Sequence, residues 1–197
     1  ATADPVHVGT AEYLLRWYVD PPPRAGHGCK LVFVSDHGDN LGSHHQFNKG
    51  QLIEESIRIP LIFHGGLSPR VNSSQVAQLI DVMPTLLEEC GISVPASVQG
   101  RALGPILRGE CETLAEECAF IETDQGAIGL RTPTHLYWMQ LAEDRRTIIP
   151  DDRCFYDLCA DPFEERNLAG NASELERELA QRLSAWNAQP PWLEHAD

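Results

Sequence analysis

Two neighbouring residues that could ligate a metal ion follow an apolar run near residue 30. Residues 31–34 are Leu-Val-Phe-Val, and Asp36 and His37 come just after them. A carboxylate beside an imidazole is a reasonable half of a site for a divalent cation, because both side chains offer unshared electron pairs. The residue types leave one alternative open, in which Asp36 caps the next turn and His37 is merely polar.

A lysine and a histidine further along the segment could serve an anionic substrate. Lys49 could bind an anionic oxygen as a point charge, although a solvated surface lysine is the simpler interpretation of this residue alone. Lysines are rare here, because Lys30 and Lys49 are the only two in the chain. His44 is either a loop histidine bonded to backbone or a residue close to the substrate, and its neighbour His45 is expected to be exposed.

The candidate residues need a strand to hold them, and residues 31–34 have the composition of one. A continuous apolar run of β-forming residues is typical of a strand buried on both faces of a parallel sheet. A second run covers residues 59–63, with Pro60 close to its start, where proline is tolerated in a strand. Ligands of open α/β sheets bind at the carboxyl ends of strands. The sequence therefore predicts two parallel strands with Asp36 and His37 at their edge.

The rest of the chain predicts a short helix, then hairpins, then a terminal helix. Asp81 suits an N-cap, Pro84 a first helical turn, and Gly91 the position after the helix end. Beyond about residue 115, short strand candidates alternate with turn-rich stretches, as in antiparallel hairpins: residues 119–121, 127–131, 136–141 and 154–156. A helix from about Glu174 to Trp186 should present Leu175, Leu179 and Leu183 on one face. The predicted fold class is α/β with an α+β appendage.

The charge balance argues against several classes of partner. With 29 acidic and 15 basic side chains the formal net charge is −14, which disfavours nucleic acid and anionic membrane surfaces. No apolar run approaches the length of a membrane span. A site for an anionic substrate in such a chain needs local positive charge, from a metal ion or from a few well-placed cations.

The six cysteines show no CxxC spacing, so a zinc ribbon or a thioredoxin-like motif is not expected. Free and mostly buried thiols are predicted, with Cys90 buried in an apolar helical stretch. No export signal is visible at the N-terminus, which favours a reducing compartment such as the cytoplasm, while export of a longer parent protein stays open.

The order of residues from Ser35 to Ile62 resembles the second signature region of type I sulfatases and phosphonate monoester hydrolases, which belong to the alkaline-phosphatase superfamily. The shared pattern is a buried strand, Ser-Asp-His-Gly-Asp, Leu-Gly, a histidine, a lysine, an acidic pair, an arginine and Pro-Leu-Ile. Further matches in the C-terminal subdomain include residues 155–158, Asp161-Pro162, Glu164 and residues 167–169. The resemblance covers about residues 30–186.

The resemblance implies a domain organisation. Residues 29–115 would be the C-terminal part of the sulfatase α/β domain, a partial alkaline-phosphatase-like sheet. Residues 116–197 would be a small antiparallel subdomain with a C-terminal helix. Residues 1–28 match the family poorly; they contain a candidate helix at residues 11–18 and a triple-proline stretch.

The resemblance also implies a role for each candidate residue. Asp36 and His37 would ligate a divalent cation, with calcium expected and manganese or magnesium as alternatives, because a histidine ligand is softer than calcium prefers. Lys49 would contact the sulfate oxygens and the nucleophile, and His44 is its companion as a catalytic candidate. Structural roles in ion pairs or in loop organisation are expected for Asp39, Glu54, Glu55, Arg58 and Arg131.

A sulfatase also needs a formylglycine, made from the first residue of a Cys/Ser-x-Pro/Ala-x-Arg sequence, and this chain has none. Residues 93–97 come nearest but end in Ser where Arg is required, and are interpreted as a loop. We therefore expect a sulfuric ester hydrolase whose nucleophile lies in a missing N-terminal half, with that half and a small-molecule sulfate ester as partners. The chain alone is expected to be inactive.

Two alternatives stay open. The first is a phosphonate or phosphate ester hydrolase of the same superfamily, because those enzymes share the signature. The second is a non-catalytic remnant that binds a protein partner through an exposed sheet edge.

Overall fold

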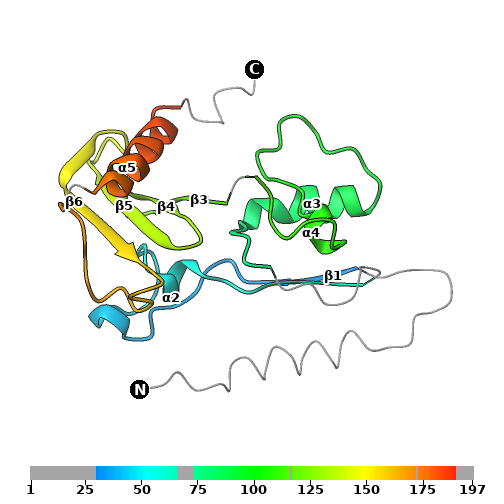
Figure 1. Cartoon of the computed structure of the whole chain (residues 1–197), viewed down its shortest axis with the longest axis horizontal. Helices are drawn as coiled ribbons and strands as arrows, with labels where there is room; N and C mark the ends of the chain where they lie inside the picture. Colours follow the sequence, from blue (N-terminus) through cyan, green and yellow to red (C-terminus); the bar gives the residue numbers. More distant parts are fainter. Residues whose placement is uncertain (1–29, 66–72, 116, 172, 190–197) are drawn as a thin grey trace.

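The computed structural model describes residues 30–65, 73–115, 117–171 and 173–189 (Figure 1). The helix predicted at residues 11–18 and the triple-proline stretch lie outside these ranges. The described part contains a two-stranded sheet, a pair of short helices and a four-stranded sheet with a helix packed on it. None of the described helices has the length and apolar character that would let it cross a membrane.

The two-stranded sheet consists of β1 (Leu31–Val34) and β2 (Leu61–His64), and it corrects the prediction of parallel strands. The strands are antiparallel, with Leu31 opposite His64 and Val34 opposite Leu61. Parallel neighbours need a connection that returns to the start of the first strand, usually through a long helix. Here the helix between them, α2 (Glu54–Ile57), has only four residues, so the chain re-enters beside the end of β1. All four residues of β1 are partly exposed, so the strand is not buried on both faces.

The four-stranded sheet confirms the antiparallel hairpins predicted after residue 115. Its strands follow one another in sequence order and each pair is antiparallel. The strands are β3 (Ala119–Glu122), β4 (Ala127–Arg131), β5 (His135–Leu141) and β6 (Ile148–Asp157). The strand expected at residues 154–156 is thus much longer than predicted, because β6 continues back along β5 past a bulge near Met139.

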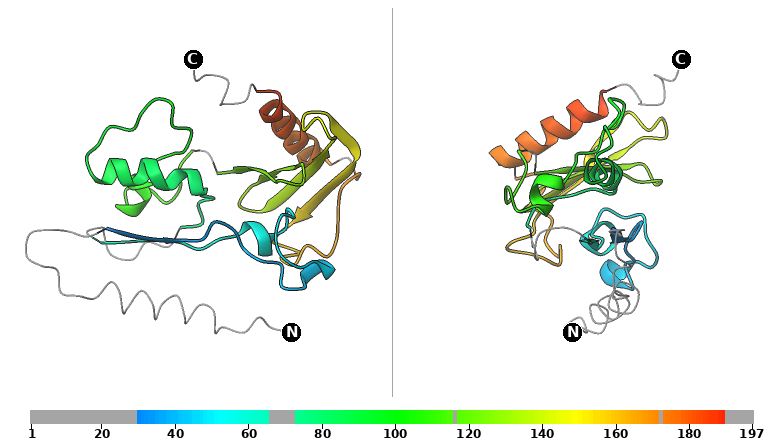
Figure 2. Two further views of the ribbon diagram at one scale, coloured as in Figure 1. Left: turned by 180° about the vertical axis from the view of Figure 1, so that it is seen from behind. Right: turned by 90° about the vertical axis from the view of Figure 1, so that its right-hand side faces the viewer.

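The terminal helix α5 (Glu174–Asn187) packs on this sheet and closes its core (Figures 1 and 2). Ser173 caps it by accepting the N–H of Glu176 at 3.1 Å. Leu179 and Leu183 are buried against β4 and β5, as their helical spacing predicts. Leu175 remains 37% exposed, because it lies on the first turn, beyond the edge of the packed core.

The helices before the sheet fold round a buried aspartate. They are η2 (Leu79–Asp81), α3 (Val82–Glu89) and α4 (Gly104–Leu107). The predicted helix is confirmed, and Gly91 has the positive φ of 69° expected after a helix end. Asp81 precedes α3 but does not cap it. Its carboxylate instead accepts the N–H of Gln78 at 2.9 Å and the N–H of Arg101 at 2.7 Å.

The five cysteines in the described ranges form no disulfide with one another, in line with the prediction, but most are not buried. Cys118 is buried, whereas Cys90 is exposed, so the prediction of a buried Cys90 is wrong. The reason lies in the side of α3 on which it falls. Pro84 and Thr85 form the buried side, while Cys90 lies with Met83 and Leu87 around an open apolar pocket.

Helix α2 is joined to the four-stranded sheet by Arg131 at the end of β4. The Nε and Nη2 atoms of Arg131 donate to the two carboxylate oxygens of Glu54, each at 3.0 Å. This pair confirms Arg131 as an anchor between the two parts of the molecule. Arg58 forms the expected ion pair with Glu54, at 3.9 Å. Glu55 forms no ion pair in the described ranges, contrary to expectation.

Candidate functional site

The carboxyl end of β1 brings three of the predicted site residues together. Asp36 and His37 follow the strand, and the loop that contains η1 (Ser43–His45) returns Lys49 to them. Nζ of Lys49 lies 2.6 Å from Nε2 of His37, and Nε2 lies 3.4 Å from Oδ2 of Asp36. The two predicted metal ligands and the predicted anion-binding lysine are therefore adjacent in space.

Hydrogen bonding fixes the tautomer of His37. Its Nδ1 lies 2.6 Å from the carbonyl oxygen of Gly38, which can only accept, so Nδ1 carries the proton. In the neutral ring Nε2 then presents a lone pair, to which the ammonium of Lys49 donates. A metal-ligating histidine commonly has its other ring N–H held in this way by a backbone carbonyl.

Asp36 is accessible and ionised. Its side chain is 78% exposed. Desolvation raises the pKa of Asp36, but the backbone N–H groups of Asp36 and His37, the charge that His37 has when its ring is protonated, and the charge of Lys49 outweigh it and hold the pKa below its usual value. Asp36 therefore presents an anionic oxygen next to the lone pair of His37.

A shared cation fits this pair of donors. Ligand atoms at about 2.0–2.4 Å from an ion lie roughly 3 Å from each other, and Oδ2 of Asp36 and Nε2 of His37 are 3.4 Å apart. Two protein donors leave most of a coordination shell open. No third His, Cys, Asp or Glu within the described ranges completes a group with them.

The three residues line an open pocket of about 500 Å³. One side is formed by Asp36, His37 and residues 49–51, and the other sides by residues 77–80 and by β3 with the start of its turn, residues 119–124. The pocket thus lies where the end of β1, the segment before α3 and the edge strand of the second sheet meet. Its volume suits a small-molecule ligand.

Two residues that sequence reasoning did not single out hold the loop in place. The N–H of Gly38 donates to the carbonyl of Ser56 at 2.8 Å, and a Cβ added at Gly38 would lie 1.9 Å from the carbonyl oxygen of Glu55. Only glycine permits this approach to α2. Asn40 is fully buried; its N–H donates to the carbonyl of Asn48 at 2.8 Å, and its side-chain amide donates to Gln51. A polar asparagine in a loop gives no signal of such burial in the sequence.

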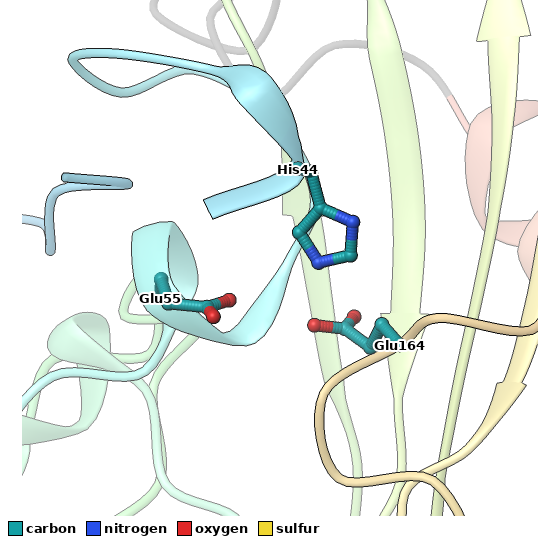
Figure 3. Close-up of side chains that lie close together, drawn as sticks. All are labelled: His44, Glu55 and Glu164. Carbon is teal, nitrogen blue, oxygen red and sulfur yellow. The ribbon is translucent and has the colours of Figure 1, made fainter. Parts of the chain in front are cut away.

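Asp39 organises the same loop, as expected, by accepting the N–H of Leu41 at 2.9 Å. His45 is exposed, also as expected. His44, however, does not line the pocket at Asp36. It lies instead beside Glu55 and Glu164 (Figure 3). The geometry therefore separates His44 from Lys49, with which the sequence had grouped it.

Known proteins similar to this chain fall in one superfamily. A family model described as N-sulphoglucosamine sulphohydrolase, C-terminal, matches residues 42–121. The multifunctional alkaline phosphatase superfamily protein PehA of Trinickia caryophylli is 32% identical over 185 residues, covering 85% of this chain and 35% of that protein. Arylsulfatase K of Xenopus laevis is 30% identical over 164 residues, covering 78% of this chain and 30% of the relative.

A solved structure is also similar to this chain. A protein solved in complex with its substrate, D-glucosamine-2-N,6-O-disulfate, matches with a TM-score of 0.72 at 29% identity, over 85% of this chain and 35% of the other. This chain thus spans about a third of the length of these relatives. The residues of the signature, the mixed fold and these similarities agree. The chain belongs to the sulfatase family of the alkaline phosphatase superfamily and corresponds to its C-terminal region.

Proposed function

We propose that this chain supplies one part of the active site of a sulfuric ester hydrolase. Asp36 and His37 would hold a divalent cation, and Lys49 would bind the sulfate oxygens. The observation that supports this best is the convergence of a carboxylate, an imidazole lone pair and an ammonium group on one open pocket, with separations of 3.4 and 2.6 Å. Further ligands and the nucleophile would come from a segment outside this chain.

Each of the three side chains has a distinct task in this proposal. A bound cation, with calcium expected and manganese or magnesium as alternatives, would act as a Lewis acid on the sulfate group. Asp36 would contribute an anionic oxygen, and His37 would contribute the lone pair of Nε2 in the tautomer that Gly38 fixes. The ammonium of Lys49, which lies 2.6 Å from Nε2, would have to move from this nitrogen to the sulfate oxygens when the ion binds. The ammonium of Lys49 faces the same pocket and would donate to sulfate oxygens, where charge develops as the ester bond breaks.

This chain contains no sequence that would produce a formylglycine. The nearest candidate, residues 93–97, is a loop, as predicted, and its residues are exposed. The nucleophile is therefore assigned to the partner segment.

A phosphonate or phosphate ester is the second candidate substrate. PehA, which 85% of this chain matches over 35% of the length of PehA, is described as multifunctional. The oxygens of a phosphoryl group are tetrahedral and anionic like those of a sulfate, so the same cation and the same lysine would bind them.

The test is hydrolysis of an aryl sulfate in calcium by the chain combined with the N-terminal segment of a sulfatase relative, matured to formylglycine. Lys49→Ala should lower kcat/KM by about 100-fold or more, the usual effect of removing one donor to a developing oxyanion. Lys30→Ala is the matched control, because Lys30, the other lysine, pairs with Glu89 at 2.7 Å and does not line the pocket. It should leave kcat/KM unchanged.

Two further measurements complete the experiment, one without the added segment and one with a second substrate. The chain without the added segment should show no turnover; turnover that survives Lys49→Ala would contradict the proposal. An aryl phosphonate monoester measured in parallel decides between the two substrate classes by the ratio of the kcat/KM values.

A further inference from the structure

Three side chains from separate parts of the sequence meet outside the pocket at Asp36. His44 belongs to η1, Glu55 to α2, and Glu164 to the connection between β6 and α5 (Figure 3). One ligand atom of each lies within 4.8 Å of the other two. None of the three lines the pocket at Asp36, so the cluster is separate from the site described above.

Two carboxylate oxygens of this cluster have no hydrogen-bond partner among the described residues. Glu164 is only 2% exposed; its Oε2 accepts the N–H of Glu54 at 2.8 Å, but its Oε1 is buried with no hydrogen bond. Oε2 of Glu55 is also buried and unpartnered. A buried acceptor left without a partner costs roughly 1–3 kcal/mol, and more when it is charged. Two such oxygens that face one imidazole therefore call for a positively charged occupant.

No side-chain cation in the described ranges forms an ion pair with either carboxylate. The nearby Arg131 is engaged with Glu54, and Arg58 also approaches Glu54. Burial raises the pKa of Glu164 to about 7; the neighbouring acidic groups Glu54, Glu55 and Asp161 act in the same direction, against the hydrogen bond from Glu54. The surroundings of Glu164 thus lack positive charge.

We propose that His44, Glu55 and Glu164 bind a zinc ion. One imidazole nitrogen and two carboxylate oxygens form a donor set that Zn²⁺ accepts, with water in the fourth position. Ligand atoms about 2.1 Å from zinc lie about 3–4 Å apart, so the three side chains need to close by only about 1 Å from their present separations. The ion would tie the loop before Lys49 and helix α2 to the C-terminal subdomain.

The test titrates Zn²⁺ alone into the metal-stripped 197-residue chain that carries Asp36→Asn and His37→Gln, so that the first pair of donors is disabled. Calorimetry should show one equivalent of bound zinc, and the Tm should rise with zinc concentration, since an ion that binds only the folded state stabilises it. Adding His44→Asn or Glu164→Gln should weaken zinc binding at least tenfold and abolish the rise in Tm.

The variants are chosen to preserve the fold. Asparagine tolerates the φ of 51° at His44, and a glutamine at position 164 can still accept the N–H of Glu54. His45→Asn and Glu165→Gln are the matched controls, because both residues are exposed neighbours and His45 shares the positive φ, at 58°. Both controls should bind zinc like the parent.

Either of two results would overturn the proposal. One is the absence of zinc binding by the parent at pH 7.5, accompanied by a higher Tm for Glu164→Gln, which would mean that a proton satisfies the cluster. The other is a zinc affinity that is the same in the His44→Asn and Glu164→Gln variants as in the two control variants. If circular dichroism shows that one of these two variants does not fold, the zinc affinity of the other variant still tests the proposal.

Discussion

At the scale of single residues, buried polar groups hold the segment that borders the pocket. Asp81 is fully buried and binds the backbone of residues 78 and 101. Thr85, also fully buried, donates its hydroxyl to the carbonyl of Asp81 at 2.5 Å and accepts the N–H of Leu103 at 2.9 Å. The first bond ties α3 to the end of η2 directly before it, and the second ties α3 to the residue that precedes α4, so the hydroxyl acts as a joint between the three helices.

Replacing Thr85 by valine tests this joint. Thr85→Val keeps the shape but removes both hydrogen bonds and leaves the buried N–H of Leu103 unpaired, so the free energy of unfolding should fall by about 1–3 kcal/mol. Urea denaturation followed by circular dichroism measures the change. Thr134→Val, at an exposed threonine, should change it by less than about 0.5 kcal/mol. Equal effects at both positions would contradict the role of Thr85.

The ion pairs of Glu89 should make the stability of the protein depend on pH. Its side chain is 8% exposed and lies 2.7 Å from both Lys30 and Arg108. The hydrogen bond from Lys30 is the largest cause that holds the pKa of Glu89 below its ordinary value of 4.5, with Arg108 acting in the same direction. Because the folded-state pKa is the lower one, the stabilisation is fully present above about pH 4.5 and is lost as the pH falls through the folded-state value.

Glu89→Gln should therefore lower the free energy of unfolding at pH 7 by about 1.5–3 kcal/mol, the range for hydrogen bonds to charged groups. The difference from the parent should shrink as the pH falls below 4.5. Urea denaturation at a series of pH values measures it, with the exposed Glu143→Gln as the control. A difference that stays constant with pH would show that charge is not its cause.

At the scale of elements, the contact between α2 and β4 joins the site-bearing loop to the second sheet. Arg131 and Glu54 form a two-bond pair in which the side chains are 19% and 12% exposed. Glu164 adds a hydrogen bond to the first residue of α2. A helix of one turn is not stable by itself, so these contacts determine its position. Gly38 and Lys49 depend on that position, because their loop packs on α2.

A double-mutant cycle with Arg131→Met and Glu54→Gln measures this joint. The coupling energy from urea denaturation should be about 1–3 kcal/mol, since the pair is largely shielded from water and makes two bonds. The matched control is the cycle of Arg58→Met with Glu54→Gln, because the side chain of Arg58 is 78% exposed and 3.9 Å away. Its coupling should be below about 0.5 kcal/mol. Similar couplings in the two cycles would refute the special role of Arg131.

At the scale of the whole molecule, one face of the described structure is apolar and exposed. Met83 and Ile92 are 48% and 55% exposed, and they border an open apolar pocket of about 520 Å³. Leu79 lines both this pocket and the one at Asp36. Exposed apolar patches of this kind commonly mark contact surfaces. The proposed partner segment that completes the active site would cover this face, as would the protein partner of a non-catalytic chain.

Met83→Lys tests the exposure of that face. The chain alone should bind a hydrophobic fluorescent dye and self-associate, and the charged side chain should reduce dye fluorescence about twofold or more by interrupting the patch. Light scattering and dye titration provide the measurements. Leu175→Lys, at an apolar residue that is 37% exposed on α5, should have little effect. A parent chain that binds no dye would contradict an accessible apolar face.

The sequence by itself determined the features that depend on neighbouring residues. Short strand candidates separated by turn-rich stretches predicted the antiparallel strands near residues 119–121, 127–131, 136–141 and 154–156, and the spacing of Leu179 and Leu183 predicted α5 with its buried face. The ordered signature from Ser35 to Ile62 singled out Asp36, His37 and Lys49, which the structure brings together. Their roles toward a cation and a sulfate stay predictions, as does the division of the chain at residues 28 and 115.

Only the tertiary structure decided the features that depend on the path of the chain. An apolar run does not encode its direction relative to a partner strand, so β1 and β2 were expected to be parallel and are antiparallel. The side on which a residue falls is likewise set by packing, as the exposure of Cys90 shows. The cluster of His44, Glu55 and Glu164 joins residues more than 100 positions apart in the sequence. No local pattern carries such a contact, because it arises only when α2 docks against the C-terminal subdomain.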